Sequence, residues 1–286
     1  MILPGLLGDN NVLRTRDLCD ALRACGFHAV ALEFRGHGRT LIRHPELYYG
    51  FGVLETLDTL AVSRWLEAQP YVHRTGLIGF CWGANHALIA GWYDDCRRDH
   101  PSINPTLAAV LPTVPEYRHF SAGVMAFSPV LRFEELIAAL ETPWSKFKHP
   151  VLSGLQQNIR TRMEYRKAGD TSGSLRRCIE FEFAHASLRY ADGFRDAVHF
   201  LRLLPYRDLP DHEKLANARM PLLIVFAAND PLSKAQDVAD LMATTSHPNT
   251  AAVVLPGGGH IGFAPYAKQY YYSLIMNFFD PSCGPR

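Results

Sequence analysis

The sequence reads Gly-Leu-Ile-Gly-Phe-Cys-Trp-Gly-Ala-Asn-His over residues 76–86. Its first five residues form a short apolar run typical of a buried strand, and the run from Trp82 to Trp92 continues as a helix of small and apolar residues. Cys81 is therefore expected on a sharp turn from strand to helix, between Gly79 and Gly83. A nucleophile on such a turn needs small neighbours, because the backbone is strained and packed closely against adjoining elements.

The position of Cys81 predicts its chemistry. At a helix N-terminus, free N–H groups and the helix dipole favour a thiolate over a thiol, and the same N–H groups can hold an oxyanion. A buried structural cysteine is the alternative interpretation, because cysteine is among the most frequently buried residues.

Further short apolar runs predict the sheet around this turn. Runs without alternation are typical of strands covered on both faces, which form parallel sheets with helices on either side. Helical spacing is found over Arg14–Cys25 and over Val53–Glu67, where Val53, Leu57, Leu60, Ala61 and Trp65 share one side. The order of elements predicts a doubly wound α/β fold. The predicted strands are the chain start, Phe27–Phe34, Thr75–Phe80, Gly123–Pro129, Pro221–Ala227 and Ala251–Leu255.

One stretch departs from this alternation of strands and helices, which indicates an insertion. Residues 131–204 combine charged residues with aromatic ones, including Trp144, Phe147, Tyr165 and Phe194. We interpret them as an inserted, mainly helical cap. Residues 1–130 and 205–286 then form the core.

Two polar motifs follow predicted strands. Asp230, in Asn-Asp-Pro, comes directly after Pro221–Ala227, and His260 follows the glycine run Gly257–Gly259 after the next strand. Open α/β sheets gather their ligands at the carboxyl ends of strands. Taken singly, Asp before Pro is a common turn former. When Cys81, Asp230 and His260 are considered together, His260 is predicted to take the proton of Cys81. Asp230 is predicted to orient His260 and to stabilise its imidazolium form.

The loop Leu3-Pro4-Gly5-Leu6-Leu7-Gly8 lies between the first strand and the first helix. It is expected to supply a second oxyanion donor, so we assign the donors as the backbone N–H groups of Leu6 and Trp82. A plain turn between strand and helix is the alternative for this loop.

These motifs resemble those of the α/β-hydrolase superfamily. More narrowly, the sequence is similar to the embryogenesis-associated hydrolases, which include carboxylesterases and medium-chain ethyl ester synthases. The resemblance extends over most of the chain and includes Phe-Arg-Gly-His-Gly around Arg35 and Gly-Gly-His-Ile-Gly-Phe around His260. The branch has serine at the position of Cys81, whereas dienelactone hydrolases and polyhydroxyalkanoate synthases resemble this chain in their Gly-x-Cys-x-Gly motif. By the same resemblance, the chain starts at the third strand of the family's sheet.

Composition excludes several other classes. The 29 Lys and Arg balance 28 Asp and Glu to a net charge of +1, which gives no field for nucleic acid. No apolar run approaches the roughly 18 residues of a membrane span, and the amino terminus does not read as a secretory signal. The six cysteines show no metal-ligand spacing, so we expect free thiols in the cytoplasm and neither a metal nor a cofactor. The sequence does not give the oligomeric state.

The predicted activity is hydrolysis of a small-molecule ester, thioester or lactone through an acyl group on Cys81. Two alternatives remain open. The same acyl-cysteine can serve an acyltransferase or cyclase, or the fold can be a catalytically silent binding protein.

Overall fold

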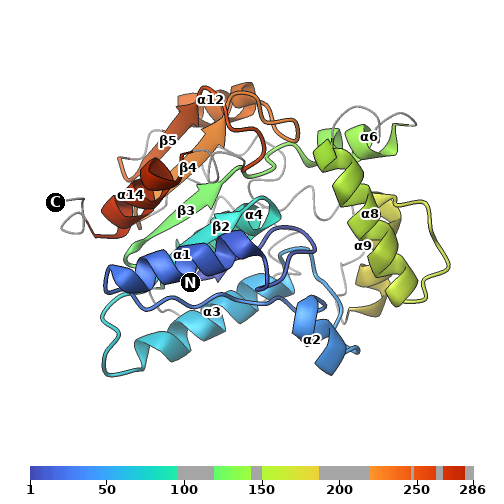
Figure 1. Cartoon of the computed structure of the whole chain (residues 1–286), viewed down its shortest axis with the longest axis horizontal. Coiled ribbons are helices and arrows are strands. Elements are labelled where there is room, and N and C mark those ends of the chain that lie inside the picture. Colours follow the sequence, from blue (N-terminus) through green and yellow to red (C-terminus); the bar gives the residue numbers. More distant parts are fainter. Residues whose placement is uncertain (96–118, 143–149, 187–218, 246–247, 262–266, 281–286) are drawn as a thin grey trace.

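In the computed structural model of the 286-residue chain, the structure describes residues 1–95, 119–142, 150–186, 219–245, 248–261 and 267–280. Five parallel strands form one sheet in the order β1-β2-β3-β4-β5. Each strand pairs with the next in sequence, as β2 does with β3 from Gly76↔Gly123 to Phe80↔Phe127. Their carboxyl ends therefore meet at one edge (Figure 1). The strands are β1 Ile2–Leu3, β2 Gly76–Phe80, β3 Gly123–Phe127, β4 Leu222–Ala227 and β5 Thr250–Leu255.

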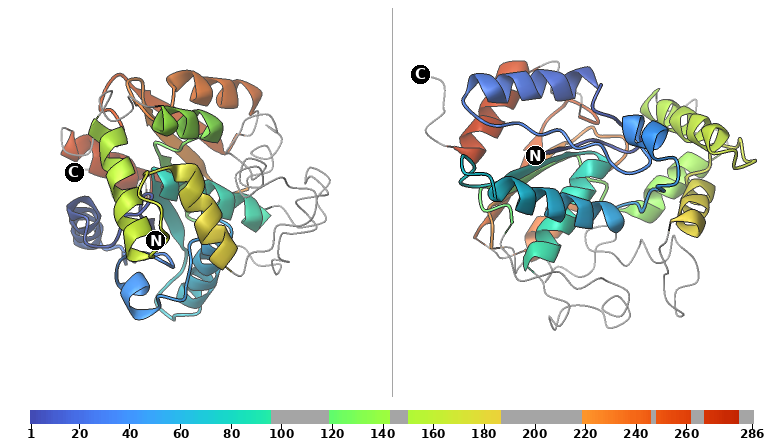
Figure 2. Two further views of the ribbon diagram at one scale, coloured as in Figure 1. Left: turned by 90° about the vertical axis from the view of Figure 1, so that its right-hand side faces the viewer. Right: turned by 90° about the horizontal axis from the view of Figure 1, so that it is seen from below.

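Helices cover both faces of this sheet (Figure 2). Alternate residues of a strand point to opposite faces, so Leu77 joins one apolar core and Ile78 the other. The first core includes residues of α3 (Leu54–Glu67), α4 (Trp82–Asp95) and α12 (Ala235–Thr244), and the second includes α1 (Leu13–Ala24) and α14 (Lys268–Phe279). The parallel α/β sandwich predicted from the sequence is confirmed.

The described part of the predicted cap is helical. It contains α6 (Phe133–Glu141), α8 (Pro150–Tyr165) and α9 (Leu175–His185), which lie beyond the carboxyl ends of the strands (Figure 1). The three helices share the first apolar core through residues such as Phe133, Ile159 and Phe183. The domain boundaries at residues 131 and 204 stay predictions, and Trp144, Phe147 and Phe194 lie outside the described residues.

One strand prediction differs from the structure, and another is confirmed at the border of the described sheet. Residues Phe27–Phe34 contact the sheet at a single parallel bridge, Ile2↔Ala31, because β1 has only two residues with which to pair. A short helix, α2 (Gly38–Arg43), follows this segment. The run Ala251–Leu255 does form β5, but it borders the described sheet on one side only, and Val254 is 46% exposed.

The predicted apolar side of α3 is confirmed at Val53 and Leu60, which are buried, and wrong at Ala61 and Trp65, which are exposed. Its buried residues are Glu55, Thr56, Thr59, Leu60 and Ser63, whereas Trp65 is 62% exposed. Polar side chains can be buried when they are hydrogen-bonded, and these are. The hydroxyls of Thr56 and Thr59 donate to the carbonyls of Gly52 and Glu55, respectively.

Candidate active site

Cys81 lies on the predicted turn between β2 and α4. Its φ is +54°, a left-handed backbone conformation that costs free energy in a residue with a side chain. The turn is held by its N–H group, which donates to the carbonyl of Phe127 at 2.9 Å. A Cβ atom on Gly79 would collide with the main chain of Gly83, and one on Gly83 with the main chain of Pro4. Only glycine fits at these two positions.

Asp230 and His260 meet at the carboxyl ends of β4 and β5. The Nδ1 atom of His260 lies 3.0 and 2.9 Å from the two carboxylate oxygens of Asp230. A carboxylate only accepts hydrogen bonds, so Nδ1 carries the proton. The Asp230 side chain is fully buried, and its carboxylate also accepts the N–H of Leu232 at 2.8 Å. The histidine loop is tied down by the N–H of Gly259, which donates to Asn229 Oδ1 at 2.7 Å.

The second ring nitrogen of His260, Nε2, faces Cys81. It is buried, and apart from the Cys81 thiol no described group is a hydrogen-bond partner for it. Burial raises the pKa of Cys81, but the charge and hydrogen bond of His260 outweigh this effect and leave the pKa below its ordinary value. Burial lowers the pKa of His260, and the charges and hydrogen bonds of Cys81 and Asp230 raise it to about 10. Both shifts favour transfer of the thiol proton from Cys81 to His260, which gives a thiolate beside an imidazolium.

Two main-chain N–H groups also point at the Cys81 sulfur. They belong to Trp82 and Leu6, and both hydrogen bonds lower the pKa of the thiol. The loop that carries Leu6 packs directly on the nucleophile: a Cβ atom on Gly5 would lie 3.2 Å from Cys81 Cβ and 3.8 Å from its sulfur. The structure thus gathers around one sulfur atom the five residues singled out in the sequence: Cys81, Asp230, His260, Leu6 and Trp82.

Arg14 is a charged neighbour of this site that the motifs do not reveal. Its guanidinium lies 5.0 Å from the ring centroid of Phe80, the residue before Cys81, and its Nε atom is buried without a hydrogen-bond partner among the described residues. Burial lowers the pKa of Arg14, and the charges of Tyr271 and Cys81 oppose that effect. The available sequence signal is a cation in the first turn of a helix, where the helix dipole disfavours positive charge.

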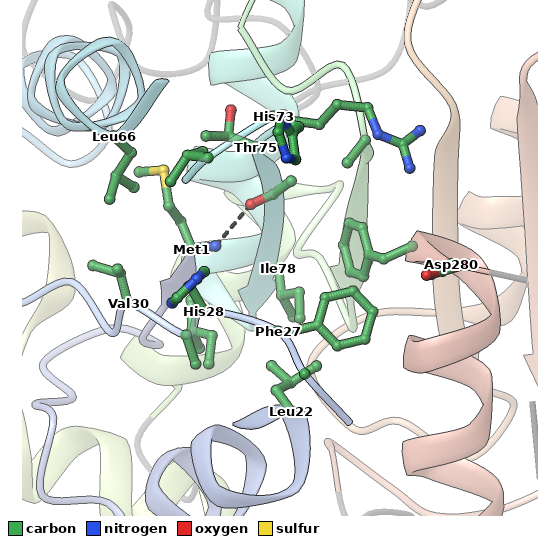
Figure 3. Close-up of a pocket in the computed structure, with 18 of the residues that line it drawn as sticks. Met1, Leu22, Phe27, His28, Val30, Leu66, His73, Thr75, Ile78 and Asp280 are labelled. Carbon is green, nitrogen blue, oxygen red and sulfur yellow. Dashed lines mark hydrogen bonds between the residues drawn. The ribbon is translucent and has the colours of Figure 1, made fainter. Parts of the chain in front are cut away.

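A cavity of about 270 Å³ lies at the other end of the sheet. It is lined by residues at the start of β1, β2 and β3, together with side chains such as His28, His73 and Phe279 (Figure 3). None of the five residues gathered at Cys81 contributes to its wall. This cavity is therefore separate from the cysteine site.

No group of three or more His, Cys, Asp or Glu side chains in the described ranges is arranged to hold a metal ion. None of the helices in this part of the chain is both long enough and apolar enough to cross a bilayer.

Comparison with known proteins places this geometry in a family. The model of the alpha/beta hydrolase family matches residues 4–270, and no curated protein matches the chain. Among solved structures, the esterase Pf2001 of Pyrococcus furiosus is 16% identical with a TM-score of 0.59, over 98% of this chain and 82% of that chain. Est1E of Butyrivibrio proteoclasticus, with ferulic acid bound, is 11% identical with a TM-score of 0.53, over 96% of this chain and 87% of its own. A structure from work on the metagenome-derived lipolytic enzymes LipS and LipT is 14% identical with a TM-score of 0.54, covering 97% and 91% of the two chains.

The family match begins in the loop of Leu6 and extends past His260, so it spans the whole of the site. At these low identities the likeness to solved structures concerns the fold. The chain belongs to the alpha/beta hydrolase family.

Proposed function

We propose that the protein hydrolyses carboxylic esters or thioesters through an acyl group carried on Cys81, with His260 and Asp230 completing a catalytic triad. One observation carries this proposal: the imidazole of His260 and the main-chain N–H groups of Leu6 and Trp82 all form hydrogen bonds to the Cys81 sulfur. A nucleophile, a proton carrier and two oxyanion donors are the parts that acyl transfer requires. The substrate is a small-molecule acyl ester, thioester or lactone.

Acylation starts from the thiolate–imidazolium pair. The sulfur attacks the substrate carbonyl carbon, a C–S bond forms, and the carbonyl oxygen takes the negative charge. The N–H groups of Leu6 and Trp82 stabilise that charge. As the intermediate collapses, the bond to the leaving group breaks, and the Nε2–H of His260 protonates the departing alkoxide or thiolate.

Deacylation uses the same groups in the opposite sense. Neutral His260 takes a proton from water through Nε2 as the water oxygen attacks the thioester carbonyl. The C–S bond then breaks, the carboxylic acid leaves, and the thiolate–imidazolium pair is restored. Asp230 holds Nδ1–H throughout and stabilises the imidazolium form.

A second candidate function differs from the first in the molecule that accepts the acyl group from Cys81. The sequence resembles the embryogenesis-associated branch, which includes ethyl ester synthases, but has Cys81 where that branch has serine. A thioester is a good acyl donor to alcohols and amines as well as to water. We therefore carry acyl transfer to an alcohol or amine, or cyclisation within the substrate, as the second candidate.

We also place the enzyme in the cytoplasm and assign residues 131–204 to a cap over the site. The first assignment is supported by the thiols of Cys19, Cys81 and Cys178, which form no disulfide within the described part of the chain, because reducing compartments keep thiols unpaired. The second is supported by the position of α6, α8 and α9 beyond the strand ends (Figure 1).

Intact-protein mass spectrometry with p-nitrophenyl esters and acyl thioesters of several chain lengths tests the proposal. We expect a mass increase equal to the acyl group, together with released p-nitrophenol, and neither in Cys81→Ala. Added ethanol or glycylamide separates the two candidates, because an acyltransferase forms the ester or amide product. Absence of any adduct and any product would support a silent binding fold instead.

A further inference from the structure

Three fully buried polar side chains lie together beside α4, and one of them belongs to this helix. They are Tyr49, Glu55 and His86, each 0% exposed, and we refer to them as the buried polar cluster. None of them contacts the Cys81 sulfur in the interactions described above. Burying polar groups costs free energy unless they are hydrogen-bonded, so the bonds that they make identify what the cluster holds.

His86 connects the cluster to Trp82. Its Nδ1 atom lies 2.7 Å from the carbonyl oxygen of Trp82, and because a carbonyl only accepts, Nδ1 carries the proton. Its Nε2 atom lies 3.0 Å from the hydroxyl of Tyr49, and the two atoms share a hydrogen bond in which the hydroxyl donates when the imidazole is neutral. The ring is stacked on Phe34, with ring centroids 4.6 Å apart. These three contacts, with Trp82, Tyr49 and Phe34, fix the orientation of the imidazole.

Glu55 fixes the chain segment that carries Tyr49. Its two carboxyl oxygens accept the N–H groups of Gly50 and Gly52, each at 2.8 Å. One of these oxygens lies 4.0 Å from His86 Nε2. The position of the Tyr49 hydroxyl is therefore set by α3 as well as by α4.

The cap is attached to the same tyrosine. The N–H of Tyr49 donates to Glu182 Oε2 on α9 at 2.8 Å, and the other oxygen of Glu182 accepts Arg162 Nε from α8 at 2.7 Å. Arg162 is 6% exposed and Glu182 is fully buried. A continuous series of hydrogen bonds thus leads from the cap helices through Tyr49 and His86 to the first residue of α4.

We propose that Tyr49 and His86 are positioning residues for the oxyanion site: they hold the main chain of Trp82 so that its N–H faces the reacting carbonyl, and they link that N–H to the cap through Glu182. The inference rests on the proposed function. The Trp82 carbonyl held by His86 belongs to the peptide directly after the one that carries the Trp82 N–H, so rotation of one peptide reorients the other. Loss of an oxyanion donor costs about 10²–10³-fold in rate, and misalignment of one is expected to cost less.

The variant Tyr49→Phe removes the hydroxyl and keeps the ring. With a p-nitrophenyl ester, we expect single-turnover acylation and kcat to fall about 10-fold, while KM changes less than about 3-fold because ground-state binding is retained. Alkylation of Cys81 by iodoacetamide should slow by a smaller factor than acylation, because the Trp82 N–H is only one of several groups that lower the pKa of the thiol. That reaction needs the thiolate but develops no oxyanion, so it reports on the sulfur alone.

Ser63→Ala is the matched control. Ser63 is a fully buried α3 residue whose hydroxyl bonds that of Thr75 at 2.8 Å, outside the cluster. It should lower the unfolding temperature as Tyr49→Phe does, and leave acylation within about 2-fold of wild type. The proposal is overturned if the two variants affect acylation equally, or if Tyr49→Phe slows alkylation as much as acylation.

Glu182→Gln tests the cap link and keeps the proposal testable if Tyr49→Phe folds poorly. We expect an acylation rate about 3-fold lower, and a double variant whose loss is smaller than the product of the two single losses, because both residues act through one series of bonds. Independent effects of the two changes would contradict the link. A wild-type protein that is alkylated at Cys81 but acylated by no ester would instead show that the proposed function itself is wrong.

Discussion

The imidazole of His260 is held by both carboxylate oxygens of Asp230, at 3.0 and 2.9 Å from Nδ1. Two acceptors on one N–H fix the plane of the ring and its tautomer, so Nε2 can only face Cys81. The geometry therefore separates two tasks: Asp230 orients and stabilises charge, and His260 moves the proton.

The paired charges predict a bell-shaped dependence of kcat/KM on pH. The pKa of Cys81 is lowered, so the thiolate persists to a lower pH than in a free cysteine, and activity falls below that point. The pKa of His260 is raised to about 10, so the proton for the leaving group is lost only near that pH. The rate of p-nitrophenyl ester hydrolysis, after subtraction of the rate of Cys81→Ala, measures the acid and the alkaline limb of this pH dependence. A maximum only above the pKa of a free thiol would contradict the ion pair.

Asp230→Asn removes the charge and one acceptor while keeping the shape of the side chain. By analogy with other triads, we expect kcat to fall about 10²–10⁴-fold, because the amide favours the wrong tautomer of His260. The pKa of Cys81 should rise, since a less basic imidazole stabilises the thiolate less. Steady-state kinetics and the pH dependence of alkylation measure these effects. Asp240→Asn, on the partly exposed side of α12, is the control.

Cys81→Ser tests whether the site is tuned to a thiolate. A serine hydroxyl does not ionise at neutral pH, and the ion pair with His260 is lost. We expect the serine variant to be at least about 100-fold slower, with an unchanged circular dichroism spectrum because serine fits the same turn. Equal or greater activity would mean that cysteine is merely tolerated at this position.

Arg14→Met removes a positive charge and keeps apolar contact with the Phe80 ring. The midpoint of the pH dependence of Cys81 alkylation should rise, because the charges of Arg14 and Cys81 interact and a nearby positive charge favours the thiolate. Arg16→Met, two residues further along α1 at an exposed position, should leave the midpoint in place. The same midpoint in all three proteins would show that Arg14 has no electrostatic role at the sulfur.

Gly83→Ala is expected to destabilise the protein by about 1–3 kcal/mol, because the added methyl group meets the main chain at Pro4. Gly154→Ala is the matched control: nothing lies near its Cβ position on exposed α8, and alanine there should stabilise by about 0.5–1 kcal/mol. Urea unfolding of both variants measures the difference. Equal stabilities would mean that the loop at Pro4 moves aside without cost.

The sequence predicts the sheet and the meeting of Cys81, Asp230 and His260 because both depend on local signals. A short apolar run followed by a polar motif locates the carboxyl end of a strand, and parallel strands bring those ends together. The pairing of Phe27–Phe34 could not be read in this way, because it depends on the length of β1, an element distant in sequence.

Buried polar groups were harder to predict. Glu55 and His86 are polar in any hydropathy pattern, and their burial depends on partners such as Tyr49 that a helical pattern does not show. Arg14 is likewise recognised only when the fold brings α1 against β2. For His86 and Arg14 the deciding contact joins segments that are far apart in the chain.

The left-handed conformation of Cys81 places a conformational cost at the atom on which the chemistry depends. Glycine would adopt the same turn without that cost, so selection for stability alone would favour a residue that cannot react. The structure offsets the strain with the N–H bond from Cys81 to Phe127 and with the glycines on either side. Mutational tolerance around residue 81 should therefore report two opposing requirements, the ease of folding and the retention of a nucleophile.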